Sequence, residues 1–210
     1  MVAEARAEEA RKPARERVLD TAAELFYREG IRAVGVDTII ARSGVAKMSL
    51  YRNFASKDEL VCAYLDRLHQ QLLAWWERVT ARHPGDPRAQ LKGLFVSLGH
   101  WVAHPRFVGC PFSSAINELR EPDNPGRLRA LGVKREVLER LSRLAAEAGA
   151  AEPDKLALQL QILMEGAYTA GQSLGPQAGP AIAAAGAALV DTALGGAQAD
   201  TGARGGPAGR

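Results

Sequence analysis

The chain has 210 residues and a mass of 22.5 kDa, enough for one large domain or for a small domain joined to a larger one. Apolar residues make up 47% and charged residues 24%, a composition typical of a globular protein and unlike that of a wholly disordered chain. Only two cysteines, Cys62 and Cys110, are present, so a disulfide scaffold is excluded.

Residues 1–17 are densely charged and contain no apolar stretch of signal-peptide length. The most apolar late stretch, residues 181–194, is mostly alanine, contains Asp191 and is shorter than a membrane span requires. Together with the low cysteine content, these features lead us to expect a soluble protein in the reducing cytoplasm.

Proline and glycine divide the chain into stretches whose apolar residues recur at helical period, and no stretch alternates as a strand does. We therefore predict an all-α protein of about nine helices. The expected helices are 13–29, two short helices within 36–54, 56–79, one carrying 91–102, 112–119, one that ends at Gly149, 154–173 and 181–194. Three pairs have the pattern of an N-cap followed by proline in the first turn: Asp86-Pro87, Asn124-Pro125 and Gly179-Pro180.

The stretch 36–54 combines two short helices with a glycine between them, the arrangement of a helix-turn-helix. The first helix has one apolar face, and Gly44 supplies the turn. In the second helix, Val45 and Leu50 are placed as a hydrophobic staple around Ala46 as N-cap, and Phe54 follows Leu50 on the same inward face.

The other side chains of this second helix are predicted to face outward. They are Lys47, Met48, Ser49, Tyr51, Arg52 and Asn53, and Lys57 follows at the start of the next helix. Cations suit phosphate or guanine, an amide suits adenine, and a methionine can contact the thymine methyl group in a major groove. Residues 31–57 carry five cationic side chains against one acidic side chain, Asp37, which favours a phosphate partner. The alternative is a solvated face between two small packing helices.

Residues 14–68 closely resemble the N-terminal DNA-binding domain of the TetR family of bacterial transcriptional repressors. The matching positions are 23–26 (AELF), Gly30, Ile39, Ala41, Gly44, Val45, Leu50, Tyr51, Phe54 and 56–60 (SKDEL). The resemblance implies that the outward residues of 47–53 contact DNA, with Tyr51 and Lys57 on phosphates. Two residues depart from the pattern. Ala46 replaces the usual Ser or Thr, which costs the helix about 1 kcal/mol, and Asp37 would repel a phosphate.

The resemblance also implies a domain organisation. We expect a flexible N-terminal arm at 1–12, the helix-turn-helix domain at 13–58 and a helical domain at 59–194 that dimerises and encloses a small ligand. The glycine-rich segment 195–210 is predicted to be a disordered tail. The implied function is that of a homodimeric repressor that binds a palindromic operator in double-stranded DNA and is released by a small molecule.

Dimerisation is also expected because one short recognition helix buries little DNA surface, whereas paired helices can read two half-sites. The helix at 154–173 is apolar on more than one side and must be covered on more than one side. We therefore predict that it forms the dimer interface with the helix at 181–194. Four small residues of the first of these helices would allow a tight crossing: Gly166, Ala167, Ala170 and Gly171.

Large apolar side chains with a few polar neighbours are typical of small-molecule cavities. The candidates for such a cavity are Trp101, Phe107, Cys110, Phe112, Asn117, Gln161, Met164 and Tyr168. The alternative is that these residues only form the core, as aromatic residues at helical spacing usually do.

Two further interpretations compete with this function. His100 and His104, four residues apart, supply half of a metal site in a helical metal-dependent enzyme, but no third ligand is evident. The second competing interpretation is a ligand-independent DNA-binding protein with a packed core. A redox-sensing role for Cys110 is a weaker interpretation than a buried apolar thiol. We find no nucleophile motif or phosphate-binding loop and expect no catalytic activity, metal or cofactor.

Overall fold

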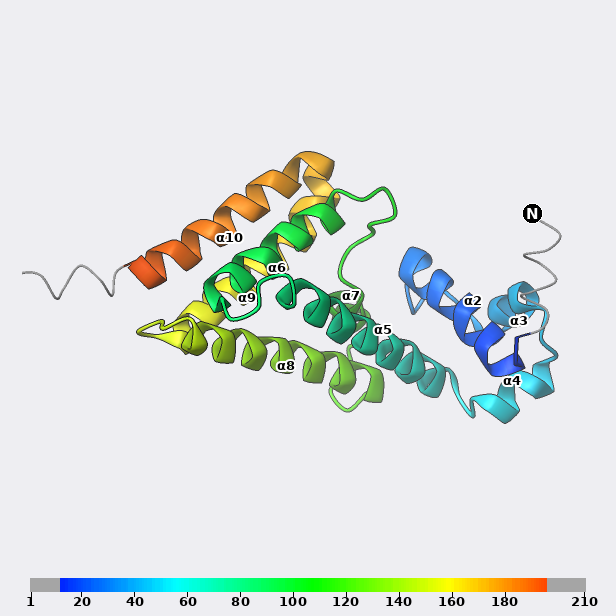
Figure 1. Cartoon of the computed structure of the whole chain (residues 1–210). Coiled ribbons are helices and arrows are strands. Elements are labelled where there is room, and N and C mark those ends of the chain that lie inside the picture. Colours follow the sequence, from blue (N-terminus) through cyan, green and yellow to red (C-terminus); the bar gives the residue numbers. More distant parts are fainter. Residues whose placement is uncertain (1–11, 196–210) are drawn as a thin grey trace, which may run out of the picture. The chain divides into compact units, whose positions relative to one another are not determined.

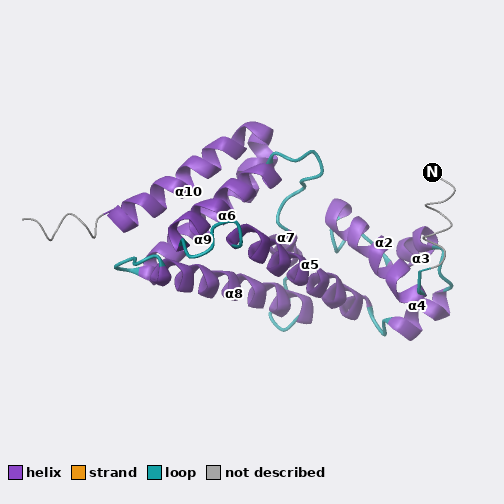
Figure 2. Ribbon diagram, viewed as in Figure 1, coloured by secondary structure: helices purple, strands orange, loops and turns teal. Residues whose placement is uncertain are grey.

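The structure is a computed structural model, and it describes residues 12–195. Within this range the regular structure is helical and contains no strand, which confirms the all-α prediction (Figures 1 and 2). The elements are α2 (Ala14–Glu29), α3 (Val36–Ser43), α4 (Lys47–Asn53), α5 (Lys57–Thr80), α6 (Pro87–Val102), α7 (Pro111–Glu118), α8 (Pro125–Glu147), α9 (Pro153–Leu174), the 3-10 turn η1 (Gly175–Gln177) and α10 (Ala178–Gly195). The predicted arm and tail fall outside the described residues, except for Lys12 and Gly195.

Two of the three N-cap and proline pairs start helices as predicted. Asp86 accepts the N–H of Ala89 at 2.9 Å, and the Asn124 side chain accepts the N–H of Gly126 at the same distance. The third prediction is wrong, because α10 begins at Ala178 and includes both Gly179 and Pro180. Pro180 lies in the first turn, where a backbone N–H has no partner within the helix, so the proline is tolerated there.

The chain divides into two compact units. Of the described residues, unit 1 comprises 12–73 together with Cys110–Lys134, and unit 2 comprises Ala74–Gly109 together with 135–195. Helix α7 and the first part of α8 therefore belong to the same unit as α2, α3 and α4. Each unit is described by itself.

In unit 1, α2, α3 and α4 pack against one another around a small apolar core. The buried side chains of this core include Val18, Ala22, Phe26, Ile39, Leu50 and Phe54. The end of α3 is closed by Gly44, whose φ of +62° is a conformation that glycine adopts without strain. The guanidinium of Arg17 donates to the carbonyls of Ser43 at 2.8 Å and Gly44 at 3.0 Å, so α2 also holds this turn.

An ion pair joins α2 to α5 within the same unit. Asp20 accepts hydrogen bonds from Arg67 at 2.5 Å and from Lys12 at 2.7 Å. Burial by itself raises the pKa of the Asp20 carboxyl, but the two cationic donors outweigh burial and hold it below its usual value. The carboxylate is therefore charged at neutral pH and ties α2 to the long α5.

In unit 2, α6, α9 and α10 pack on one another, and α10 lies along α6 (Figure 1). Glycines let the α6 and α10 backbones approach closely. A Cβ on Gly99 would lie 2.4 Å from the carbonyl oxygen of Gly179, and one on Gly186 would lie 2.3 Å from the ring of Phe95. Asp191 of α10 pairs with Arg88 and Lys92 of α6, at 2.5 Å in each case.

The run Pro153–Gly195 is long and apolar enough to cross a membrane by length and composition alone. In the structure this run is not one straight helix. It comprises α9, η1 and α10, and Gly175 ends α9 with a φ of +70°. Because α9 and α10 pack on each other and on α6, part of the apolar surface of this run is buried inside unit 2.

We predict that Gly186→Ala lowers the stability of the protein by about 2 kcal/mol, because the added methyl group forces the Phe95 ring to move. The control is Gly132→Ala in α8, where no neighbouring atom lies within 4 Å of the added Cβ. That variant should gain about 0.5–1 kcal/mol from helix propensity. Denaturant unfolding measures both values, and equal effects of the two variants would contradict the close approach of α10 to α6.

Candidate DNA-binding surface

Helix α4 is anchored from behind by apolar side chains. Leu50 and Phe54 are each 1% exposed and Val45 is 6% exposed, so both residues of the predicted staple are buried. Ala46 makes no side-chain capping bond, as its methyl group dictates. Its carbonyl instead accepts the N–H groups of Ser49 at 2.8 Å and Leu50 at 3.1 Å, which closes the first turn.

The outward side chains of α4 differ in how far they reach into solvent. Met48 is 72% exposed and Tyr51 is 41% exposed, and Lys47 and Arg52 are exposed as well. Ser49 and Asn53 are half-buried. The side-chain amide of Asn53 donates to the Ser49 carbonyl at 2.7 Å, and this bond must open before Asn53 can donate that N–H to a base.

Asp37 lies at the start of α3 and pairs with Lys47 at the start of α4, with 3.5 Å between the carboxylate and the ammonium. Its position in the first turn suits the positive end of the helix. Because the Asp37 side chain is 89% exposed, the pair lies in solvent and is weak. The acidic residue noted in the sequence therefore lies beside one of the cations on this surface and offsets part of its charge.

Lys57 opens α5 beside a capping arrangement. Ser56 Oγ accepts the N–H of Glu59 at 3.1 Å, and the Glu59 carboxylate accepts the N–H of Ala55 at 2.7 Å. Burial lowers the pKa of the Lys57 ammonium, and the nearby carboxylates of Glu118 and Asp58 partly oppose that shift.

Two cations of α2 were not identified from the sequence. The guanidinium of Arg15 lies 4.9 Å from the centre of the Phe54 ring, which places a positive charge beside the end of α4. Arg17 holds the turn before α4, as described above. In the sequence both appear as ordinary solvated charges on an amphipathic helix, and no local pattern indicates their partners.

The structure brings together part of the predicted ligand-binding set, all in unit 2. The Phe107 ring lies 6.1 Å from that of Trp101 in an edge-on arrangement and 6.3 Å from that of Tyr168 in a stacked one. Met164 is buried and Gln161 is half-buried on the preceding turns of α9.

The remaining members of the set belong to unit 1. Cys110 and Phe112 are buried at the start of α7, and Asn117 is exposed near its end. The Lys134 ammonium lies 3.3 Å from the Cys110 sulfur.

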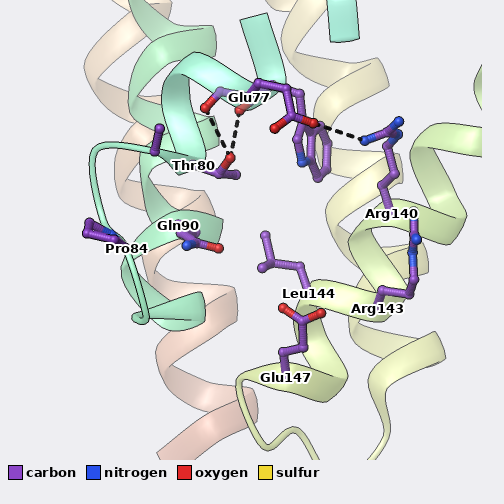
Figure 3. Close-up of a pocket in the computed structure, with 10 residues that line it drawn as sticks. Glu77, Thr80, Pro84, Gln90, Arg140, Arg143, Leu144 and Glu147 are labelled. Carbon is purple, nitrogen blue, oxygen red and sulfur yellow. Dashed lines mark hydrogen bonds and ion pairs between the residues drawn. The ribbon is translucent and has the colours of Figure 1, made fainter. Parts of the chain in front are cut away.

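A hollow of about 420 Å³ opens in unit 2 where the end of α5, the following loop, α6 and the end of α8 meet (Figure 3). Its lining is largely polar: Trp76, Glu77, Thr80, Ala81, Pro84, Gln90, Arg140, Arg143, Leu144 and Glu147. None of the predicted ligand-binding residues lines it. Arg140 pairs with Glu136 at 2.9 Å. It also faces Glu77 at 3.9 Å (Figure 3). Binding of a ligand by the residues named from the sequence remains a prediction.

The two histidines considered as metal ligands are exposed on α6 and just after it. His104 accepts the N–H of Arg106 through Nδ1 at 3.1 Å and stacks on Trp101 with 5.6 Å between the ring centres. Among residues 12–195, no three His, Cys, Asp or Glu side chains are grouped so that they could hold a metal ion.

Comparison with known proteins agrees with the helix-turn-helix assignment. Residues 18–64 match the family described as bacterial regulatory proteins, tetR family. Over 90 residues the chain is 36% identical to the HTH-type transcriptional activator FasR of Mycolicibacterium smegmatis, a match that covers 43% of this chain and 41% of FasR. It is 33% identical over 90 residues to the HTH-type transcriptional repressor KstR2 of Mycobacterium tuberculosis, covering 41% of this chain and 43% of KstR2. These matches thus span about two fifths of each curated relative.

One solved structure extends the likeness to nearly the whole chain. A putative TetR transcriptional regulator of Streptomyces avermitilis, sav143, is 30% identical and superposes with a TM-score of 0.78. The match covers 87% of this chain and 98% of that protein. Both the helix-turn-helix and the larger helical region are therefore shared, and the chain belongs to the TetR family of bacterial transcriptional regulators.

Proposed function

We propose that this protein is a cytoplasmic, homodimeric, ligand-responsive repressor that binds a palindromic operator. The observation that carries the proposal is the surface of α4. Lys47, Met48, Tyr51 and Arg52 extend into solvent while Leu50 and Phe54 hold the helix from behind. Such a helix can enter a major groove with its exposed side chains against base edges.

The side chains around α4 divide by the chemistry that they offer. Arg52 is suited to guanine O6 and N7, and Met48 to a thymine methyl group. Tyr51 and Lys57 offer a hydroxyl and an ammonium to phosphates, and the start of α5 adds backbone N–H groups of its own. Arg15 extends this cationic surface beside Phe54. Base contacts would therefore come from α4 and phosphate contacts from its flanks.

The names of the relatives include both directions of regulation, since FasR is an activator and KstR2 a repressor. We propose repression because a dimer bound over a promoter blocks it without any further contact. Activation requires, in addition, a surface that recruits the transcription machinery. A promoter fused to a reporter measures the direction.

An exposed apolar face in unit 2 supports the proposed dimer. Leu158 and Ile162 of α9 are 52% and 63% exposed, and they share a helix face with the exposed Gly166. This face suits the contact of one α9 with the same helix of a partner. The predicted use of all four small residues is corrected here, because Gly171 is covered by Val102 and Phe107 of its own chain.

Ala167 is likewise buried within the chain, at 2% exposure. The reason is helical periodicity, which places 164, 167 and 171 on the face of α9 that packs inward and 158, 162 and 166 on a different one. The exposed alanines of α10 extend the apolar surface. Two copies joined through α9 and α10 would present two recognition helices to half-sites about one helical turn of DNA apart.

For the effector, we propose an apolar or aromatic small molecule that contacts Trp101, Phe107 and Tyr168. These rings already contact one another, and Gln161 supplies a polar group on the same helix as Tyr168. To lower operator affinity tenfold, the molecule must bind the released state more tightly by about 1.4 kcal/mol.

Selection of bound duplexes from a random DNA pool tests the proposed function. We expect the full-length protein to enrich a palindrome whose half-sites are separated by about one helical turn. Enrichment of a single unpaired half-site would contradict binding as a dimer. Failure to retain any duplex at low ionic strength would overturn DNA binding itself.

Phosphate and base contacts are separable by mutation. The double variant Tyr51→Phe with Lys57→Ala should weaken binding to all duplexes alike and reduce the slope of log affinity against log salt by about 1, because phosphates carry no sequence information. Arg52→Ala should instead relax the preference at particular operator positions and cost about 1–3 kcal/mol there. Titrations at several salt concentrations with matched and mismatched operators measure both effects, and an exchange of the two outcomes would contradict the assignment.

The pair between Asp37 and Lys47 limits general affinity. We expect Asp37→Asn to strengthen binding to every duplex and to steepen the salt slope by about 0.9, since Lys47 becomes free to neutralise one phosphate. The control is Asp123→Asn, which makes the same charge change at an exposed site in the turn before α8. An unchanged or weaker affinity of the Asp37 variant would show that the pair positions Lys47 productively.

A further inference from the structure

Helix α7 ends against the turn that joins α2 to α3 within unit 1. Glu118, its last residue, accepts the backbone N–H of Arg32 at 2.8 Å through Oε2. The carboxylate also covers Gly30, where a Cβ would lie 3.1 Å from Oε2 and 3.2 Å from Oε1. Two features therefore favour glycine at position 30. Its φ is +93°, and the Glu118 carboxylate packs against the position that a Cβ would occupy.

The same carboxylate acts on the start of α5. Its charge raises the pKa of the Lys57 ammonium against the lowering caused by burial. Lys57 in turn lies 6.0 Å from the centre of the Phe26 ring, and Phe26 is part of the core beneath α2. Glu118 is thus linked by a hydrogen bond to the turn before α3 and by charge to the cation that opens α5.

Glu118 extends from a well-supported helix end. The Arg127 guanidinium donates to the carbonyls of Ile116 and Leu119, the latter at 3.2 Å. These bonds satisfy carbonyls that have no partner within α7. The backbone at Gly126 packs closely on Leu119 and on Val61 of α5, so that a Cβ there would lie within 3.0 Å of both side chains. The end of α7 from which Glu118 extends is therefore held by α8 and α5.

We propose that Glu118 is a positioning residue of the DNA-binding surface. It holds the α2–α3 turn against the end of α7, and so sets the orientation in which α4 meets DNA. The turn leads directly into α3, on which α4 packs, so a shift of the turn moves the recognition helix. This inference rests on the proposed function, because it assigns Glu118 a part in DNA binding without contact to DNA.

Three variants of the full-length protein test the proposal. Glu118→Ala removes both the acceptor and the charge, and Glu118→Gln keeps an acceptor for the Arg32 N–H while removing the charge. Glu121→Ala is the control, since it removes an exposed carboxylate three residues away. The measurements are affinity for the selected operator, hydrogen exchange of the Arg32 amide and thermal unfolding.

We expect Glu118→Ala to weaken operator binding about fivefold, which corresponds to part of the energy of one hydrogen bond to a charged group, and to speed exchange of the Arg32 amide. Glu118→Gln should restore affinity to within about twofold of the parent and restore amide protection, and Glu121→Ala should match the parent. This rescue by an uncharged acceptor distinguishes positioning from a purely electrostatic effect on DNA.

Other results overturn the proposal. If Glu118→Ala and Glu118→Gln both strengthen binding, the carboxylate acts only by repelling phosphate. If Glu118→Ala lowers the unfolding temperature but leaves the affinity of the folded protein unchanged, its role is stability alone. Either result leaves the proposed function intact, whereas failure of the parent protein to bind any duplex removes both.

Discussion

The burial of Leu50 and Phe54 beneath α4 is the constraint on which the rest of the DNA-binding surface depends. Helix α4 has seven residues and no side-chain cap at its start, so it would not persist as an isolated helix in water. Its exposed residues have defined directions only because two apolar side chains are fixed in the core formed with α2 and α3. The directions of the exposed α4 side chains therefore depend on the packing of Leu50 and Phe54 in the core.

Several polar contacts then restrict how this small core is placed. Arg17 closes the turn before α4, and the ion pair of Asp20 with Arg67 connects α2 to α5. Glu118 reaches the turn before α3 from the end of α7. Each of these contacts joins elements that are separated in sequence, and each uses a charged group whose hydrogen bonds are stronger than those between neutral partners. These hydrogen bonds therefore restrict the orientation of the recognition helix α4.

The sequence predicted the fold class and most helix positions because periodicity, glycine and proline are local signals. The burial of Val45 and Leu50 and the turn at Gly44 were predictable for the same reason. The partners of Arg15 and Glu118 were not, since nothing local indicates which distant group a surface charge will meet. Asn53 is an intermediate case, because its outward position was predicted, but its bond to Ser49 depends on a rotamer. The small residues of α9 were assigned together, although helical geometry divides them between two faces.

The order of the chain within unit 1 bears on its synthesis. This unit is built from two separate segments, one ending at Leu73 and the other beginning at Cys110. As the polypeptide leaves the ribosome, the helix-turn-helix emerges well before the segment that carries Glu118. The α2–α3 turn of the nascent chain therefore lacks its hydrogen bond to Glu118 until the second segment has emerged. A fragment that stopped at Leu73 would carry every side chain that we assign to DNA contacts and would lack the α7 carboxylate that binds the α2–α3 turn.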